Sequence, residues 1–249
     1  MWKTNFNEAV EYIIKTVREK TGVSLDDSVV VEDRSYDVYF FGARTLAQYA
    51  TRFEKSARAD QIRNVLELYG VMMKAVDMVT DDGTKTMNYY CDLMKRPSLF
   101  DRDDFASSLV SSFVKIGYVG KEDLDNFYAV ARESLNERNS RNVNEYLCAR
   151  REVTRYLVKI GIISIREFID NKRFNEFFYR LLHVVDLFDC ACDLREDVER
   201  KEISFHVGLQ ERLKIYSEAT KYFVTLVVRY PFVLKDVVRF WEVLNRPHR

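Results

Sequence analysis

The sequence contains few residues that interrupt helices, with eight glycines and three prolines among 249 residues. This scarcity argues against a loop-rich or sheet-rich chain with many tight turns. The share of hydrophobic residues is 47%, and aromatic residues make up 14%, which excludes a disordered chain. We therefore expect a compact, helix-rich globular protein.

The chain also lacks a net charge, because 39 basic and 39 acidic side chains cancel. No global field would draw it to nucleic acid or to an anionic membrane. No apolar run approaches the roughly 18 to 20 residues of a membrane span, and the first residues lack a signal-peptide pattern. We expect a soluble, cytoplasmic protein with no integral membrane segment, and the sequence is compatible with peripheral membrane contact and with a homodimer.

Only four cysteines are present, at positions 91, 148, 190 and 192, and none forms a Cys-x-x-Cys motif. On a helix, Cys190 and Cys192 would lie about 200° apart, which suits neither a shared metal nor a disulfide. The pattern predicts reduced core thiols in a cytosolic protein. The Glu-x-x-His pairs of a di-iron bundle are also missing.

Hydrophobic periodicity predicts about nine helices in a single domain over residues 1–249. The breaks fall at short polar or proline-containing segments, and none resembles a long linker. Ten segments are candidates for these helices, near residues 7–20, 35–55, 59–80, 84–94, 101–117, 121–137, 141–160, 173–201, 207–229 and, after Pro231, 232–245.

Two of these helices carry aspartate pairs with the same spacing, Asp77 with Asp81 and Asp193 with Asp197. Residues four apart on a helix differ by about 40° in azimuth, so both carboxylates of a pair face one side. Asp186 and Asp189 fall within about 40° of Asp193, which makes a stripe of four acids on an otherwise apolar helix. A buried stripe of like charges is costly unless a cation lies against it.

If the two helices face each other, their carboxylates form two walls of one cavity, as ligand sites in helical bundles do. Oxygen ligands alone suit a hard ion that keeps its waters and bridges to phosphate, which indicates Mg²⁺. The substrate implied by such a site is a diphosphate.

Two stretches resemble the opening of the squalene and phytoene synthases. These are Ser35-Tyr36-Asp37-Val38-Tyr39-Phe40-Phe41-Gly42-Ala43-Arg44 and the run from Tyr69 to Asp82. The family shows a Ser-x-x-Phe segment followed by Tyr-Ala-x-Cys-Arg-x-x-Asp-Asp-x-x-Asp. The registration places Asp77 and Asp81 on the metal-binding aspartates, Lys74 on the arginine and Gly70 on the tyrosine.

The second family pattern, Asn-x-x-Arg-Asp-x-x-x-Asp, is similar to the run from Asp189 to Asp197. Both final aspartates are kept, while Asp189 stands for the asparagine and Cys192 for the arginine. Tyr146 lies in the place of the family's tyrosine-containing helix. Because Gly70 and Cys192 depart from the pattern, the resemblance points to the wider class I isoprenoid synthases rather than to phytoene synthesis.

The resemblance implies an all-α bundle around a central cavity and a Mg²⁺-dependent enzyme that ionises an allylic prenyl diphosphate for coupling or cyclisation. Asp77, Asp81, Asp193 and Asp197 would be the catalytic metal ligands, with Asp189 as an optional fifth ligand. The implied substrate-binding residues are Lys74, Arg200, Arg44, Arg151, Tyr146 and Ser35.

Two other function classes stay open on the sequence. The first is a non-catalytic protein of the same fold that binds a prenyl diphosphate or a protein partner, which the altered positions Gly70 and Cys192 would permit. The second is a metal-dependent phosphohydrolase on a helical bundle, but the adjacent His-Asp ligands that it would use are missing.

Overall fold

The computed structural model describes residues 2–25, 36–81, 85–96, 105–120, 123–199 and 203–235. Within these ranges the chain is all-α, and no described residue belongs to a β-strand. The contacts between residues divide the chain into two compact units. The single domain over residues 1–249 stays a prediction.

The first unit comprises residues 1–124, 161–171 and 239–249. Its helices are α1 (Trp2–Thr21), α3 (Tyr36–Phe53), α4 (Ala59–Asp81), α5 (Met87–Lys95) and α6 (Phe105–Ile116). A glycine follows the last residue of α1: Gly22 has a φ of 72° and donates its N–H to the carbonyl of Arg18 at 2.9 Å. This left-handed C-terminal cap is a conformation that glycine adopts at little cost.

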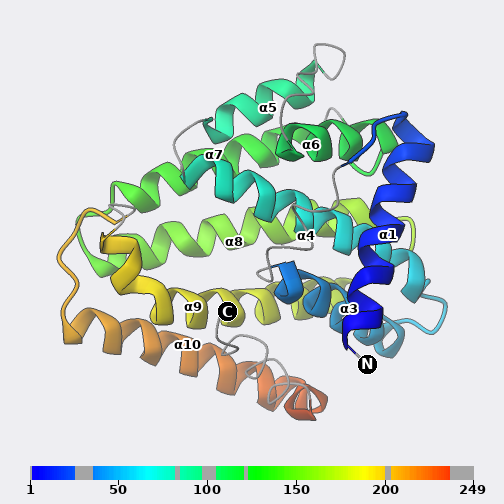
Figure 1. The fold of residues 1–249 in the computed structure, drawn as a ribbon. Helices are drawn as coiled ribbons and strands as arrows, with labels where there is room; N and C mark the ends of the chain where they lie inside the picture. Colours follow the sequence, from blue (N-terminus) through cyan, green and yellow to red (C-terminus); the bar gives the residue numbers. More distant parts are fainter. Residues whose placement is uncertain are drawn as a thin grey trace. The chain divides into compact units, whose positions relative to one another are not determined.

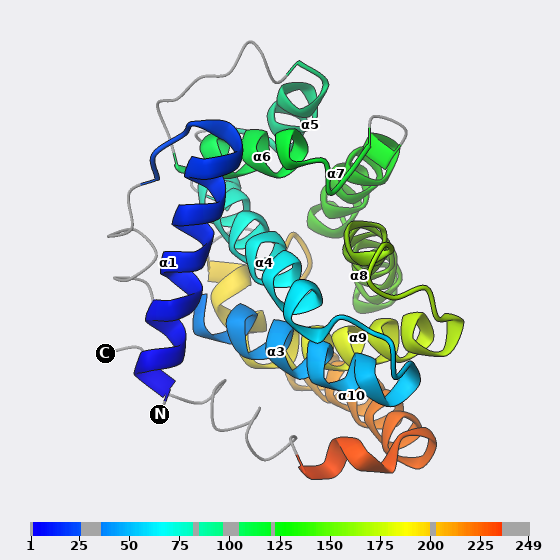
Figure 2. The same ribbon diagram turned by 90° about the vertical axis from the view of Figure 1, so that its right-hand side faces the viewer.

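Helices α3 and α4 lie side by side in this unit (Figure 2). They pack tightly at Gly70, where an added Cβ would lie 2.9 Å from the Cβ of Tyr39. The two backbones can come this close only because Gly70 lacks a side chain. The glycine at this position of the resemblance is therefore a packing requirement of α3 on α4.

The second unit comprises residues 125–160 and 172–238. It contains most of α7 (Leu124–Arg138) and α8 (Val143–Ile165), together with α9 (Lys172–Glu199), α10 (Leu209–Arg229) and the 3-10 helix η2 (Pro231–Val233). Helices α9 and α10 run side by side as a helical hairpin (Figure 1). Glu211 supports the start of α10, because its carboxylate accepts the Gly208 N–H at 2.8 Å.

One apolar core cluster joins α8, α9, α10 and the segment that leads into α10. Tyr146 of α8 is 1% exposed in this cluster and packs on Phe205, with ring centroids 5.9 Å apart. The other buried members are Val143, Leu147, Leu187, Cys190, Ala191, Leu194, Ile203, Ile215 and Ala219. The cluster holds the acid-bearing helix α9 against its two neighbours in the unit.

Most predicted helices are confirmed to within a few residues, including the two that carry the aspartate pairs. Helix α8 extends to Ile165, beyond the predicted end at residue 160. Only η2 and the two residues after it are described in the predicted helix 232–245, and the rest of that range lies outside the described residues. None of the described helices is both long enough and apolar enough to cross a membrane.

Candidate functional site

The first aspartate pair belongs to one uninterrupted helix, since both Asp77 and Asp81 fall within α4. The Asp77 side chain is 56% exposed, and its carboxylate lies 3.5 Å from the ammonium of Lys74, one turn earlier. This exposed i, i+3 ion pair contributes little to stability. The side chain of Asp81 lies outside the described residues. Asp77 and Lys74 therefore present a carboxylate and a cation from the same face of α4.

The second pair also belongs to one helix, because Asp193 and Asp197 both fall within α9. Asp189 is exposed and Asp197 is half-buried, whereas the side chain of Asp193 lies outside the described residues. The sequence predicted a stripe on a buried helix, and this prediction is wrong at Asp189. The buried face of α9 is a different one, which carries residues such as Phe177, with 0% exposure.

The fourth acid of the stripe, Asp186, is bound to Arg150 of α8 in a two-point contact. The Arg150 Nε donates to one Asp186 oxygen at 3.0 Å, and Nη2 donates to the other at 2.6 Å. The hydroxyl of Thr154 donates to the Asp186 carboxylate at 2.6 Å. The cation that the acidic stripe requires is therefore supplied at Asp186 by the protein itself.

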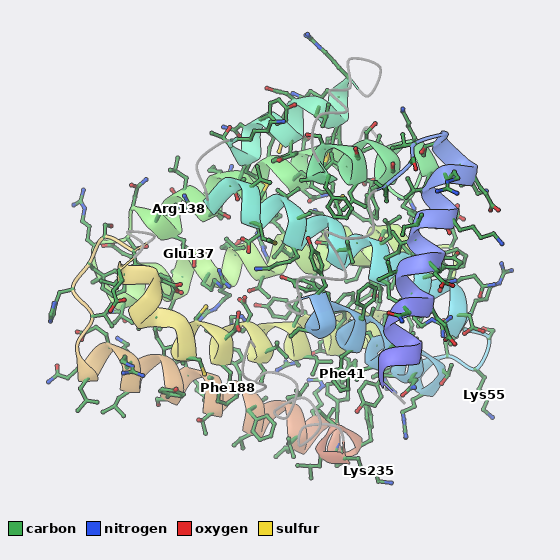
Figure 3. All side chains as sticks on the ribbon, viewed as in Figure 1. Phe41, Lys55, Glu137, Arg138, Phe188 and Lys235 are labelled. Carbon is green, nitrogen blue, oxygen red and sulfur yellow. The ribbon has the colours of Figure 1, made fainter. Side chains whose placement is uncertain are left out.

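Arg150 also binds Glu137, because its Nη1 donates to the Glu137 carboxylate at 3.1 Å. Glu137 precedes Arg138, the last residue of α7 (Figure 3). Burial raises the pKa of Glu137, and Arg150 offsets part of that rise. Burial alone would lower the pKa of Arg150, but the neighbouring Asp186, Cys190 and Glu137 raise it well above its usual value. The guanidinium is consequently a permanent charge that links α7, α8 and α9.

Three of the predicted substrate-binding residues, Arg44, Tyr146 and Arg151, make contacts that the sequence did not predict. In the first unit, Arg44 of α3 donates to the carboxylate of Glu67, a residue that is 1% exposed on α4, at 3.2 Å. Burial raises the pKa of Glu67, which Arg44 and Arg63 partly offset. Arg44 thus neutralises a buried acid, which is a structural role.

In the second unit, Tyr146 lies in the apolar core described above, where burial raises its pKa well above the usual value. Arg151 is exposed at the rim of a pocket, with its guanidinium carbon 5.9 Å from the centre of the Tyr222 ring. Arg150, one residue earlier, is the arginine that reaches the acidic stripe. The predicted residues Ser35 and Arg200 lie outside the described residues.

The sequence does not reveal the cluster in which Arg150, Asp186 and Glu137 meet the Thr154 hydroxyl. No local spacing could reveal it, because Arg150 and Asp186 come from different helices and are separated by 36 positions. All four cysteines are free, as predicted, but Cys148 and Cys192 are exposed, so the prediction of core thiols is correct only for Cys91 and Cys190.

The described side chains include no group of three or more His, Cys, Asp or Glu residues placed to hold a metal ion. Two of the five predicted ligands, Asp81 and Asp193, are not among those side chains. The donor chemistry of the other three, Asp77, Asp189 and Asp197, fits a hard cation such as Mg²⁺, which prefers carboxylate oxygens and water.

Comparisons of the chain with protein-family models, with curated proteins and with solved structures found no match.

Proposed function

We propose that the protein is a Mg²⁺-dependent class I isoprenoid synthase that ionises an allylic prenyl diphosphate for coupling or cyclisation. The observation that carries the proposal is that each aspartate pair lies on a single uninterrupted helix, α4 or α9. Because residues four apart on a helix lie on the same face, each pair can direct both of its carboxylates to one side of its helix. Asp77 and Asp189 are also accessible to a ligand from solvent.

In this proposal, Asp77 and Asp81 form one half of the metal site, and Asp193 and Asp197, with Asp189, form the other half. Bound Mg²⁺ would neutralise the negative charge that develops on the leaving diphosphate. Lys74 is suited to a second role, because its ammonium is only 3.5 Å from Asp77. Once a metal ion neutralises Asp77, the ammonium can bind a diphosphate oxygen instead. Arg200 would be the corresponding cation after the second pair.

The reaction would break the allylic C–O bond, and its electron pair would leave with the diphosphate oxygen. The resulting allylic cation would be attacked by a π bond of a second isoprenoid or of the same chain. The reaction would end when the product cation loses a proton or captures the diphosphate. The protein must exclude water from the cation, because water would otherwise trap it.

The alternative is a non-catalytic protein of the same fold that binds a prenyl diphosphate or a protein partner. The packing at Gly70 favours this alternative, because an added Cβ would lie 2.9 Å from Tyr39. The tyrosine that the family carries at this position therefore has no room here. Cys192, an exposed residue whose Sγ lies 3.9 Å from the Tyr216 hydroxyl, replaces the family's arginine.

Release of diphosphate tests the proposal and separates it from the alternative. The protein is incubated with Mg²⁺ and with geranyl, farnesyl or geranylgeranyl diphosphate, with and without isopentenyl diphosphate. We expect release with at least one substrate, and we expect Asp77→Asn to abolish it. Asp60→Asn is the matched control, because Asp60 lies on the same helix and also pairs with a cation three residues away, Arg63. Saturable Mg²⁺-dependent binding without release would support the non-catalytic alternative. The absence of both binding and release would refute the synthase proposal and the prenyl diphosphate form of the alternative.

A further inference from the structure

A pocket of about 230 Å³ opens between α8, α9 and α10 of the second unit. It lies on a different flank of α9 from the aspartate stripe: His183 and Leu187, which line it, are turned by about 80° and 120° from Asp193. The pocket is smaller than the roughly 300 to 1,000 Å³ of sites for drug-sized ligands. A small ligand would fill it.

The floor of the pocket includes His183, a residue that is 1% exposed. Its ring is stacked on Tyr179, with centroids 5.7 Å apart, and meets the edge of Tyr222 at 4.6 Å. The buried Nδ1 atom of His183 has no hydrogen-bond partner among the described residues. A buried polar atom left unpaired is costly, so this nitrogen favours a ligand or a water in the pocket.

The rim of the pocket is strongly basic. Arg151 of α8 and Lys214 and Lys221 of α10 all line it, and each of the three residues is exposed. Lys214 donates to the Asn144 side chain, while Lys221 lies 3.7 Å from Glu218, the one carboxylate among the lining residues. Three cations therefore oppose a single carboxylate, which leaves an excess of two positive charges around a small concave space.

The guanidinium of Arg151 is well placed for a ligand. No described acid forms a salt bridge with it, and its nearest aromatic contact is the Tyr222 ring at 5.9 Å. A planar guanidinium matches the oxygens of a phosphate group, and the two lysine ammonium groups add compact charges from the opposite helix. The excess of two positive charges equals in size the charge of a phosphate dianion. A ligand with one carboxylate would compensate only half of this excess.

We propose that this pocket binds the phosphate group of a small phosphorylated ligand, with Arg151, Lys214 and Lys221 binding the phosphate oxygens and His183 forming the floor. The site requires no metal ion and uses none of the paired aspartates. Arg151 is the one residue that it shares with the substrate-binding residues implied by the resemblance, so the site is independent of the metal site of the isoprenoid synthase proposal.

Binding of inorganic phosphate to the full-length protein, measured by isothermal titration calorimetry in EDTA at constant ionic strength, tests the inference. We expect saturable binding at millimolar phosphate. The double variant Arg151→Gln/Lys221→Gln should weaken it by about tenfold or more, because charge-assisted hydrogen bonds are lost. Glu218→Gln should strengthen it, since the one carboxylate among the lining residues is removed. These opposite directions cannot both arise from a general loss of folding.

The matched control is Lys159→Gln/Lys235→Gln, which removes two positive charges from exposed residues that do not line the pocket. This control should leave phosphate affinity unchanged. Equal weakening by both double variants, or no saturable binding to the wild type, would overturn the inference. Acetate should compete poorly and sulfate well, and acetate competing as strongly as sulfate would overturn the assignment to phosphate. Asp77→Asn should not alter phosphate binding, so this test and the synthase test can fail separately.

Discussion

Replacement of Arg150 by methionine should strongly destabilise the protein, because the guanidinium is the shared partner of two carboxylates. It contacts Asp186 at 2.6 and 3.0 Å and Glu137 at 3.1 Å. Removal of one partner from a buried ion pair costs roughly 3 to 5 kcal/mol. The side chains of Arg150, Asp186 and Glu137 are 24%, 16% and 12% exposed, so we reduce this figure to about 2 to 4 kcal/mol for solvent screening.

Thermal unfolding followed by far-UV circular dichroism measures this loss. For a chain of this size, about 1 kcal/mol lowers Tm by roughly 2 to 4 °C, so Arg150→Met should lower Tm by about 4 to 16 °C. The control is Arg155→Met on the same helix, where the arginine forms a more exposed ion pair with Glu152 at 2.6 Å. That change should cost at most about 1 kcal/mol.

The loss should also depend on pH in a defined direction. Burial already raises the pKa of Glu137 above 4.5, and removal of Arg150 takes away the main group that lowers it. A carboxyl with a raised pKa in the folded state destabilises the fold as pH rises above the unfolded value. The difference in stability between variant and wild type should therefore be full near neutral pH. It should shrink as pH falls through the raised pKa of Glu137 toward 4.5. A loss equal to that of Arg155→Met, or a difference independent of pH, would refute the role assigned to Arg150.

Three further predictions concern packing and burial. Gly70→Ala should lower the free energy of unfolding by up to about 2 kcal/mol, because overpacking against Tyr39 outweighs the gain in helix propensity. Gly42→Ala should instead raise the free energy of unfolding, because its added Cβ meets no atom within 4 Å. Denaturant unfolding that gave both changes the same sign would contradict this packing. Burial lowers the pKa of His183 from 6.5 to about 4. As pH falls from about 6.5 to 4, the unfolded state binds a proton at this residue and the folded state does not, so the free energy of unfolding should fall by about 3 kcal/mol. Titration of this ring near pH 6.5 in an NMR experiment would be inconsistent with its burial. Leu187→Ala should cost about 2 to 5 kcal/mol, since the side chain is 1% exposed in the core of the second unit, and a loss below about 1 kcal/mol in the same unfolding assay would argue against that core.

The sequence predicted the helices well because their signals are local. The apolar spacing from residue 59 to 80 anticipated α4 to within one residue, and Gly22 follows the end of α1 as a left-handed cap. The same local rule correctly predicted that each aspartate pair shares one helix. Periodicity reports which residues share a helix face, and this information was sufficient for these features.

The partners of the charged residues could not be predicted in the same way. Asp186 and Arg150 come from different helices, and their contact depends on the rotation of α8 against α9. Arg44 donates to Glu67, whose burial does not follow from the periodicity of α4 alone. The substrate-binding role of Arg44 stays a prediction. The role of Gly70 likewise depends on a neighbouring helix that no local pattern identifies.

The proposed function requires that the aspartates of α4 and α9 bind metal ions and a prenyl diphosphate together. The most direct measurement is calorimetric titration of an unreactive farnesyl diphosphate analogue, in the presence of Mg²⁺, into the wild type, Asp77→Asn, Asp193→Asn and the double variant. If the two pairs form one site, each single change should remove most of the affinity, and the double change should add little further loss. Losses that simply add, or binding that neither single change weakens, would contradict a shared site.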